Sequence, residues 1–301
     1  MRLALVINRS AGSFRTLPLD DTVAAITAAL VAAGHGVETH LVGRRELART
    51  LSALAERPGI EAVVVGGGDG TILTAVLAGI GGAKPLGVLP LGTLNLFARD
   101  LALPLDPVDA ARALAGAEPA EIDLAEVNGL PFAIWASLGM HPWVVRRRDH
   151  LQRHGMRKGR AMLLAALRAF RRYPMVDVTL TTPDGSLAVT TPLLFITNNA
   201  WKDQRPPLAR EALDTGRLTI HVAACTGRLG LLWLVAQAFL GHWRASRRLQ
   251  SFSATEVRVT SRKRRVMVSL DGEVTVMNSP LVFKVRPRAL RVLMPVGGDG
   301  A

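Results

Sequence analysis

The chain has 301 residues, 49% of them hydrophobic, so it can bury one large core or two domains and is not a disordered tail. A formal charge of +13 and a pI near 11.3 predict attraction to an anion, which leaves nucleic acid, acidic lipid and nucleotide phosphate open. The single cysteine, Cys225, excludes an internal disulfide and fits a reducing cytoplasm.

The first 115 residues alternate strand-like and helical patterns. Strands are expected at 3–8, 37–42, 61–66 and 86–90, and helices at 20–33, 44–56, 71–80 and 107–115. This alternation is typical of a parallel sheet with helices on both faces, whose ligands bind at the carboxyl ends of the strands. The short apolar run at the N-terminus fits a first strand better than a signal peptide.

After residue 122 the pattern changes to strands separated by turns, which predicts a mainly antiparallel second domain of sandwich type. We expect domains at 1–122 and 123–301, with the last ~12 residues packing back on the first. Expected strands are 121–127, 131–137, 175–182, 187–197, 217–223, 254–260, 264–270, 273–277 and 281–285, and expected helices are about 156–172 and 227–248. The longest apolar stretch, 229–243, is shorter than the roughly 20 residues that span a bilayer.

The segment VVVGGGDGTIL at 63–73 predicts a strand, a glycine-rich turn and a helix N-terminus. Free N–H groups and the helix dipole at such a turn favour a phosphate, although a plain tight turn explains the glycines equally well. The segment has neither the lysine of a P-loop nor GxGxxG spacing. Asp69 inside the turn makes sense if a cation accompanies the phosphate.

Two further segments have a structural and a functional interpretation. Residues 89–99 (LPLGTLNLFAR) fit a strand end followed by a helix capped by Thr93 or Asn95. Residues 269–273 (SLDGE) fit a hairpin with a type I′ turn centred on Asp-Gly. Taken alone, neither segment requires a ligand.

Together these segments resemble the diacylglycerol kinase catalytic-domain family, which includes bacterial lipid kinases and sphingosine and ceramide kinases. The resemblance rests on GGGDGT at 66–71, PLGTLNLFARDL at 90–101 and DGE at 271–273, supported by segments 8–12, 122–124, 136–139 and 213–218. These matches run in order over nearly the whole chain. The resemblance implies an α/β nucleotide-binding domain, a β-rich lipid-substrate domain and a cleft between them.

The resemblance also implies ATP-dependent phosphorylation of a lipid hydroxyl with Mg²⁺, a reaction that depends on positioning and charge neutralisation. Asp271 is then the base that accepts the hydroxyl proton, Glu273 lies beside the metal or nucleotide, and Asp69 organises the metal or the phosphate-binding loop. Asp123 and Asp214 are further candidate metal ligands. The expected nucleotide-binding residues are Asn8, Gly66, Gly67, Gly68, Gly70, Thr71, Gly92, Thr93 and Asn95.

Two positions depart from the family pattern. Leu96 replaces an aspartate that many relatives have, and Arg9 replaces the proline of NPxSG. The first departure leaves open a catalytically weak, nucleotide-sensing membrane-binding module. A kinase for a soluble substrate, related to NAD kinase, is the other alternative.

The expected partners are ATP, a lipid and an anionic membrane. Between Arg146 and Arg172 lie ten basic residues and one acidic residue, which predict a basic amphipathic helix. Such a helix would attach a cytoplasmic protein peripherally to the inner face of the membrane, although a helix packed on the sheet with solvated arginines fits equally well. The apolar face of the helix at 229–249 is expected to be mostly core, with Trp243 at the headgroup level. Nucleic acid is not expected, because aromatic residues do not interleave with the basic run. A homodimer stays open.

Overall fold

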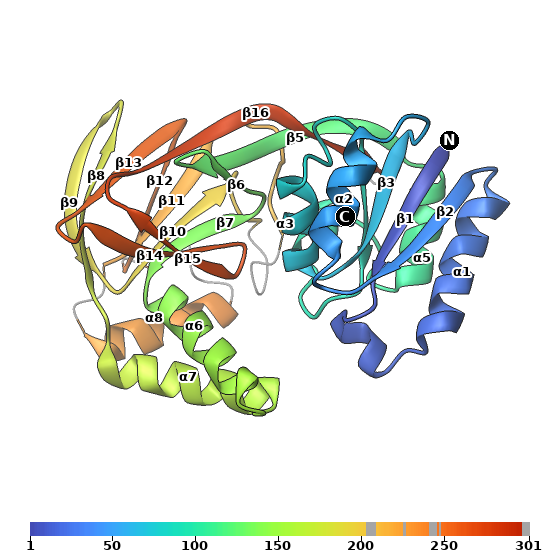
Figure 1. The fold of residues 1–301 in the computed structure, drawn as a ribbon. Helices are drawn as coiled ribbons and strands as arrows, with labels where there is room; N and C mark the ends of the chain where they lie inside the picture. Colours follow the sequence, from blue (N-terminus) through green and yellow to red (C-terminus); the bar gives the residue numbers. More distant parts are fainter. Residues whose placement is uncertain (203–208, 225–226, 241–245, 247, 297–301) are drawn as a thin grey trace. The chain divides into compact units, whose positions relative to one another are not determined.

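The computed structural model describes residues 1–202, 209–224, 227–240, 246 and 248–296 (Figure 1). The chain folds into two compact units. The first comprises Met1–Leu124 and the chain from Pro287 onward, and the second comprises Ala125–Arg286. The chain passes from one unit to the other within two long strands, β5 (Glu118–Val127) and β16 (Leu281–Met294).

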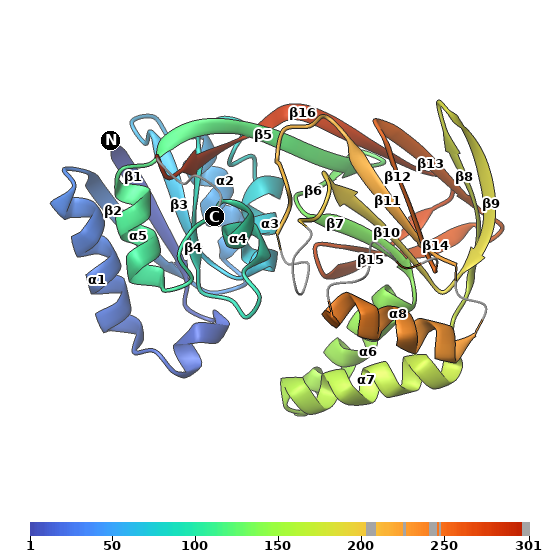
Figure 2. The same cartoon turned by 180° about the vertical axis from the view of Figure 1, so that it is seen from behind.

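The first unit is a parallel sheet in the order β2-β1-β3-β4-β16, with helices α2 and α3 on one face and α1 and α5 on the other (Figures 1 and 2). Its other strands are β1 (Arg2–Asn8), β2 (Gly36–Val42), β3 (Ala62–Gly67) and β4 (Leu86–Pro90). Its helices are η1 (Gly12–Arg15), α1 (Leu19–Ala32), α2 (Leu47–Glu56), α3 (Asp69–Leu77), α4 (Leu96–Asp100) and α5 (Pro107–Ala115).

The register of this sheet aligns the ends of its central strands. Ile7 pairs with Gly66, and Gly67 pairs with Pro90, so β1, β3 and β4 end at the same edge. Every residue of β3 and β4 is buried, as expected for parallel strands covered on both faces. The turns that follow these strands therefore lie side by side.

The second unit is a β-sandwich. One sheet is antiparallel, in the order β12-β11-β10-β7-β14-β15. Opposite it lie the antiparallel series β16-β13-β8-β9 and the β5-β6 hairpin. The strands are β6 (Leu130–Phe132), β7 (Trp135–Gly139), β8 (Val176–Thr182), β9 (Gly185–Thr191), β10 (Leu193–Asn198), β11 (Leu218–Ala223), β12 (Leu249–Ala254), β13 (Glu256–Ser261), β14 (Arg265–Leu270) and β15 (Glu273–Asn278).

The core of the sandwich is one apolar cluster with members from both sheets, among them Leu138, Ile196, Val259 and Phe283. The outer face of the six-stranded sheet carries three helices: α6 (Met140–Arg153), α7 (Lys158–Arg172) and α8 (Arg228–Leu240). Within the described part of the chain, no helix is both long and apolar enough to cross a bilayer.

The predicted fold class, an α/β unit followed by a mainly antiparallel β unit, is confirmed. The expected strand at 187–197 is wrong, because the chain turns at Pro192 between β9 and β10. Proline has no N–H for a ladder, and the Thr191 hydroxyl instead bonds the Leu193 carbonyl (2.9 Å). The expected strand at 131–137 is also two strands, β6 and β7.

Helix α6 was not expected, because it buries only Met140, Pro142 and Val145 and its apolar periodicity is too sparse to detect. Of the expected helix at 227–248, the described part is α8 over Arg228–Leu240, residues 241–245 and 247 lie outside the described residues, and β12 begins at Leu249. Strand β16 runs nine residues beyond the expected end at 285, to Met294. Trp243 lies outside the described residues.

Candidate active site

The end of β1 and the first turn of α3 are joined by a buried amide-hydroxyl hydrogen bond. Asn8, the last residue of β1, donates from Nδ2 to the Thr71 hydroxyl (3.0 Å) and accepts the N–H of Ser10 on Oδ1 (3.0 Å). Both Asn8 and Thr71 are 8% exposed. The side chain of Asn8 therefore ties the β1 loop to the first turn of α3.

The glycine-rich turns after β3 and β4 touch through their backbones. A Cβ added to Gly92 would lie 2.4 Å from the Gly68 Cα and 2.7 Å from the Asn95 Oδ1. A Cβ on Gly66 would meet Ile7 and one on Gly67 would meet Thr71, each at 2.4 Å. These glycines are required for close approach, and they let α3 begin directly at the sheet edge with Gly68 as its N-cap.

Asp69 points from the first turn of α3 to the neighbouring helix. Its Oδ1 accepts the Phe97 N–H (3.1 Å), so the carboxylate caps α4, whose own N-cap Asn95 makes no side-chain cap bond. Asn95, in the left-handed region (φ 50°), instead accepts the Gly92 N–H on Oδ1 (2.7 Å). Burial raises the pKa of the Asp69 carboxyl, and the backbone N–H groups around it oppose that rise. Asp69 thus ties the two turns together.

The two departures from the family pattern have local explanations. Leu96 is 3% exposed, so an apolar side chain fills the position where many relatives have an aspartate. The Arg9 N–H donates to the Val42 carbonyl (3.0 Å), a bond that proline could not make. Thr93 is exposed and lies near Gly12, whose added Cβ would be 3.7 Å from the Thr93 hydroxyl.

The nucleotide-binding residues predicted in the first unit are therefore brought together at one sheet edge. The N–H groups of the first helical turn have no partner within a helix, so the start of α3, at Gly68, Asp69 and Gly70, offers donors and a positive dipole end to an anion. Asp123 is placed elsewhere in this unit: it is fully buried in β5, and its Oδ1 accepts the Arg288 N–H (3.1 Å).

In the second unit, Asp271 is a buried carboxylate at the tip of a hairpin. Asp271 and Gly272 have φ of 46° and 87° and join β14 to β15, as expected for a type I′ turn. Its oxygens accept three backbone N–H groups, those of Ala133 (2.7 Å), Ile134 (2.9 Å) and Trp135 (2.9 Å). Burial raises the pKa of Asp271 to about 6, and these donors and the charge of Arg210 oppose the rise.

The remaining predicted carboxylates of this unit are exposed. Glu273 begins β15, and Asp214 lies in the connection before β11. Over the described residues, no group of three or more His, Cys, Asp or Glu side chains could hold a metal ion. A Mg²⁺ ion commonly takes one or two carboxylates plus substrate phosphates and water, so Asp69 beside the glycine-rich turns fits that mode, whereas a metal cage made of protein side chains alone does not.

Two buried polar features of the second unit were missed from the sequence. Arg210 is 2% exposed and donates from Nη1 to the carbonyls of Ala133 (2.8 Å) and Asn198 (3.0 Å). It therefore clamps the same segment that Asp271 holds. His141 Nδ1 lies 2.7 Å from the Ser137 hydroxyl, and burial first, then the Arg148 charge, lowers the pKa of His141 to about 4. Nothing in the sequence indicates that Arg210 is buried. The Ser137–His141 pair had one sequence signal, because Ser137 lies in the segment 136–139 that supports the family resemblance.

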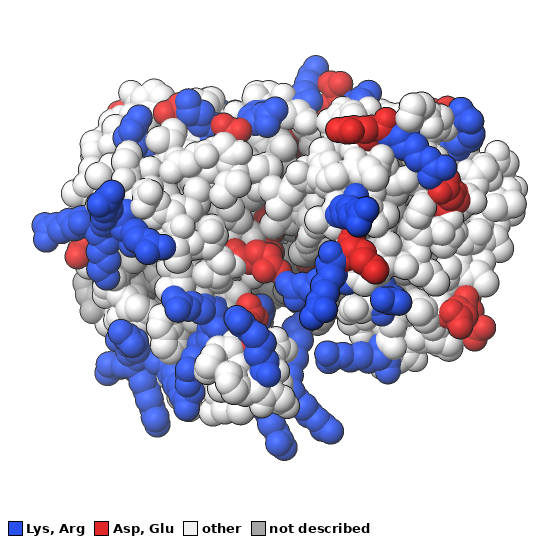
Figure 3. All heavy atoms as spheres, in the orientation of Figure 1, with Lys and Arg blue, Asp and Glu red and all other residues white. Residues whose placement is uncertain are grey.

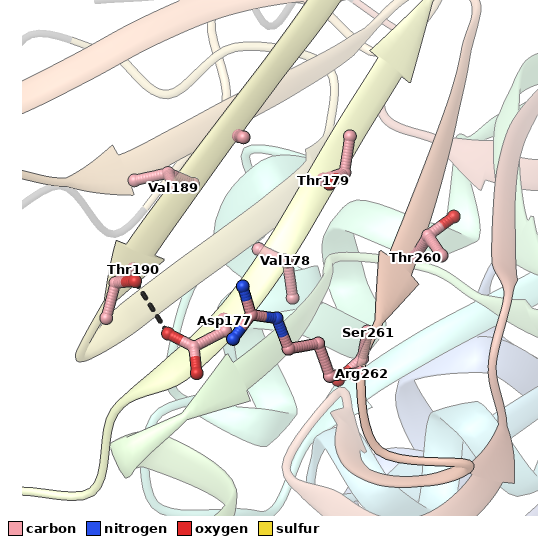
Figure 4. A pocket seen from close by; sticks show the side chains of 9 residues that line it. Asp177, Val178, Thr179, Val189, Thr190, Thr260, Ser261 and Arg262 are labelled. Carbon is pink, nitrogen blue, oxygen red and sulfur yellow. Dashed lines mark hydrogen bonds between the residues drawn. The ribbon is translucent and has the colours of Figure 1, made fainter.

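A cavity of about 380 Å³ lies on another part of the second unit (Figure 4). It opens on β8, β9 and β13, and its lining includes Asp177, Thr190 and Arg262. The Thr190 hydroxyl donates to Asp177 Oδ1 (2.6 Å). None of the predicted site residues lines this cavity.

Comparison with known proteins gives consistent similarities. The family described as diacylglycerol kinase catalytic domain matches residues 2–127, and the YegS C-terminal NAD kinase beta sandwich-like domain matches residues 136–294. A Pseudomonas aeruginosa protein named "Probable lipid kinase YegS-like" is 30% identical over 285 residues, which cover 92% of this chain and 91% of that protein. The crystal structure of a diacylglycerol kinase from Bacillus anthracis str. Sterne has a TM-score of 0.69 at 16% identity and covers 98% of this chain and 97% of that chain.

Proposed function

Because this chain belongs to the diacylglycerol kinase catalytic-domain family, we propose that it transfers the γ-phosphate of ATP to the hydroxyl of a lipid. The observation that carries this proposal is Asp271: a carboxylate fixed by three backbone N–H groups, with a pKa of about 6 because it is buried. Such a group is mostly ionised at pH 7, as a general base must be.

The atoms of Asp271 define its proposed role. A carboxylate offers about four lone-pair sites. Oδ1 accepts two N–H groups and Oδ2 accepts one, so Oδ2 keeps capacity for the hydrogen bond of an acceptor hydroxyl. In the proposed reaction Oδ2 takes the hydroxyl proton as the lipid oxygen attacks the γ-phosphorus and ADP leaves.

The two turns of the first unit would hold the nucleotide. The backbone N–H groups at Gly68 and Gly70 and the start of α3 stabilise phosphate charge, and Asn8 and Asn95 fix the shape of the turns by the hydrogen bonds described above. A Mg²⁺ ion, when bound with the nucleotide beside Asp69, would neutralise charge on the phosphates. Since the acceptor is a lipid, we place the reaction at an anionic membrane surface.

The experiment measures transfer of label from γ-³²P-ATP with Mg²⁺ to an extracted lipid mixture and, separately, to NAD. We expect labelled lipid, and a loss of about 10²–10⁴-fold in Asp271→Asn with unchanged ATP affinity. The exposed turn residue Asp184 provides the matched control, because Asp184→Asn removes a carboxylate of the same unit without touching this segment. Labelled NAD would favour a soluble acceptor, the second candidate, which the name of the matched C-terminal domain suggests. ATP binding without any labelled product would contradict both.

A further inference from the structure

Helix α7 packs against its unit through small residues and exposes large apolar side chains on its other side. Its fully buried residues are Ala161, Ala165 and Ala169, each 0% exposed, while Leu164 and Phe170 are half-buried. At 100° per residue, Leu163 and Leu167 lie opposite these alanines, and they are 69% and 45% exposed. A helix that serves only the core of its own unit would bury its leucines and expose its alanines.

Helix α8 also exposes apolar side chains on the side opposite its packed one. Leu231 and Leu234 are 5% exposed and anchor it to the unit. On the opposite side, Leu229 is 82% exposed and Trp233 is 55% exposed. Leu232 and Leu240 are also exposed, at 50% and 57%. Among the described side chains of α8, the expectation of a mostly buried apolar face therefore holds for Leu231 and Leu234 and is wrong for the four exposed apolar residues.

The two helices are neighbours. The Arg228 guanidinium donates from Nη2 to the Arg171 carbonyl (2.7 Å), and the Tyr173 hydroxyl donates to the Gly227 carbonyl (3.1 Å). Ala169 of α7 and Leu231 of α8 belong to one apolar cluster. Both ribbon views place α7 and α8 together on the outer side of the second unit. Their exposed apolar side chains therefore belong to one region of the surface.

Basic residues surround these apolar side chains. Figure 3 shows Lys and Arg side chains gathered over the region of α6 to α8, with uncharged side chains between them. Neither α7 nor α8 contains an acidic residue, and the exposed arginines on them are Arg160, Arg168, Arg171, Arg172 and Arg228. An apolar patch with a cationic border complements a layer of anionic headgroups over hydrocarbon.

We propose that the outer faces of α7 and α8 form a membrane-docking surface, which inserts Leu163, Leu167, Leu229 and Trp233 into an anionic lipid leaflet. The arginines bind the headgroup phosphates, and the indole of Trp233 lies at the interface, where tryptophan is favoured. A second copy of this chain fits the surface poorly, because it would place arginines against arginines. This inference deepens the proposed function by naming the membrane contact that a lipid acceptor requires.

The test measures binding of the full chain to vesicles of phosphatidylglycerol and phosphatidylcholine, and to phosphatidylcholine alone, without nucleotide. We expect binding to the anionic vesicles. Brominated acyl chains should quench tryptophan fluorescence in the wild type, and this quenching should be lost in Trp233→Phe. The double variant Leu163→Gln/Leu167→Gln should bind about 30-fold more weakly. Each substitution removes about half of the free energy that full burial of a leucine side chain provides, because we expect each leucine to insert partly. The matched control is Val31→Gln, at a 51% exposed position on α1 of the other unit, which should bind as the wild type does.

Two results would overturn the inference: wild-type protein that does not bind anionic vesicles, or a double leucine variant that binds them unchanged. Loss of a concentration-dependent dimer in the same variant, with vesicle binding unaltered, would identify a second copy as the occupant instead. Far-ultraviolet circular dichroism of each variant excludes unfolding, since glutamine keeps helix propensity. Kinase activity toward a short-chain diacylglycerol in monomeric solution, without vesicles or micelles, separates the two proposals, because a docking failure leaves that activity intact.

Discussion

The protonation of Asp271 should make folding stability depend on pH. Its pKa rises from an ordinary 3.8 to about 6 in the folded protein because the carboxyl is buried. The folded state therefore holds the proton more tightly than the unfolded chain does. By linkage, the contribution is fully present below the unfolded pKa of 3.8 and is lost as pH rises through about 6. A difference of about two pKa units corresponds to about 3 kcal/mol.

The assay compares the free energy of unfolding of the wild type and Asp271→Asn, by urea denaturation, between pH 4 and 8. Asparagine does not titrate, so the difference between the two proteins isolates this carboxyl, while other groups such as Asp69 cancel. We expect the wild type to lose about 2.5 kcal/mol relative to the variant over this range, since at pH 4 the unfolded carboxyl is already partly ionised. A difference that stays flat with pH would refute the reasoning, because it would mean that the three N–H groups and the Arg210 charge fully offset the cost of burial.

Three further predictions concern the first unit. Gly92→Ala should destabilise it by about 1–3 kcal/mol in thermal unfolding, since the new Cβ would lie 2.4 Å from the Gly68 Cα, whereas Gly116→Ala, with open space around it, should not. Asp69→Ala should cost about 1 kcal/mol by removing the cap of α4, while Asp69→Asn keeps an acceptor oxygen and should cost less; equal stability losses would argue against the cap. Thr71→Val should cost about 1 kcal/mol of unfolding free energy by removing the hydroxyl that accepts the Asn8 side-chain amide, and an unchanged unfolding temperature would show that this hydrogen bond contributes nothing.

Local chemistry made much of the site predictable. The type I′ turn at Asp271 and Gly272 needs a backbone shape that few other residues adopt, so a hairpin tip there follows from the sequence. The glycines at 66–68 directly follow a β-branched apolar run, so a strand end there follows from the sequence too. The alternation of apolar runs likewise determined the α/β class of the first half. These features depend on neighbours in the chain.

Only the tertiary structure decided what each side chain touches. The sequence could not show that Asp69 caps α4, that Asp271 holds the segment 133–135, or that Arg210 is buried against that segment. Nor could it show that α7 buries Ala161, Ala165 and Ala169 and exposes Leu163 and Leu167, because the sequence does not say which side of the helix faces the core. Periodicity identifies a face, but the partner of that face depends on which surfaces the rest of the fold leaves to be covered.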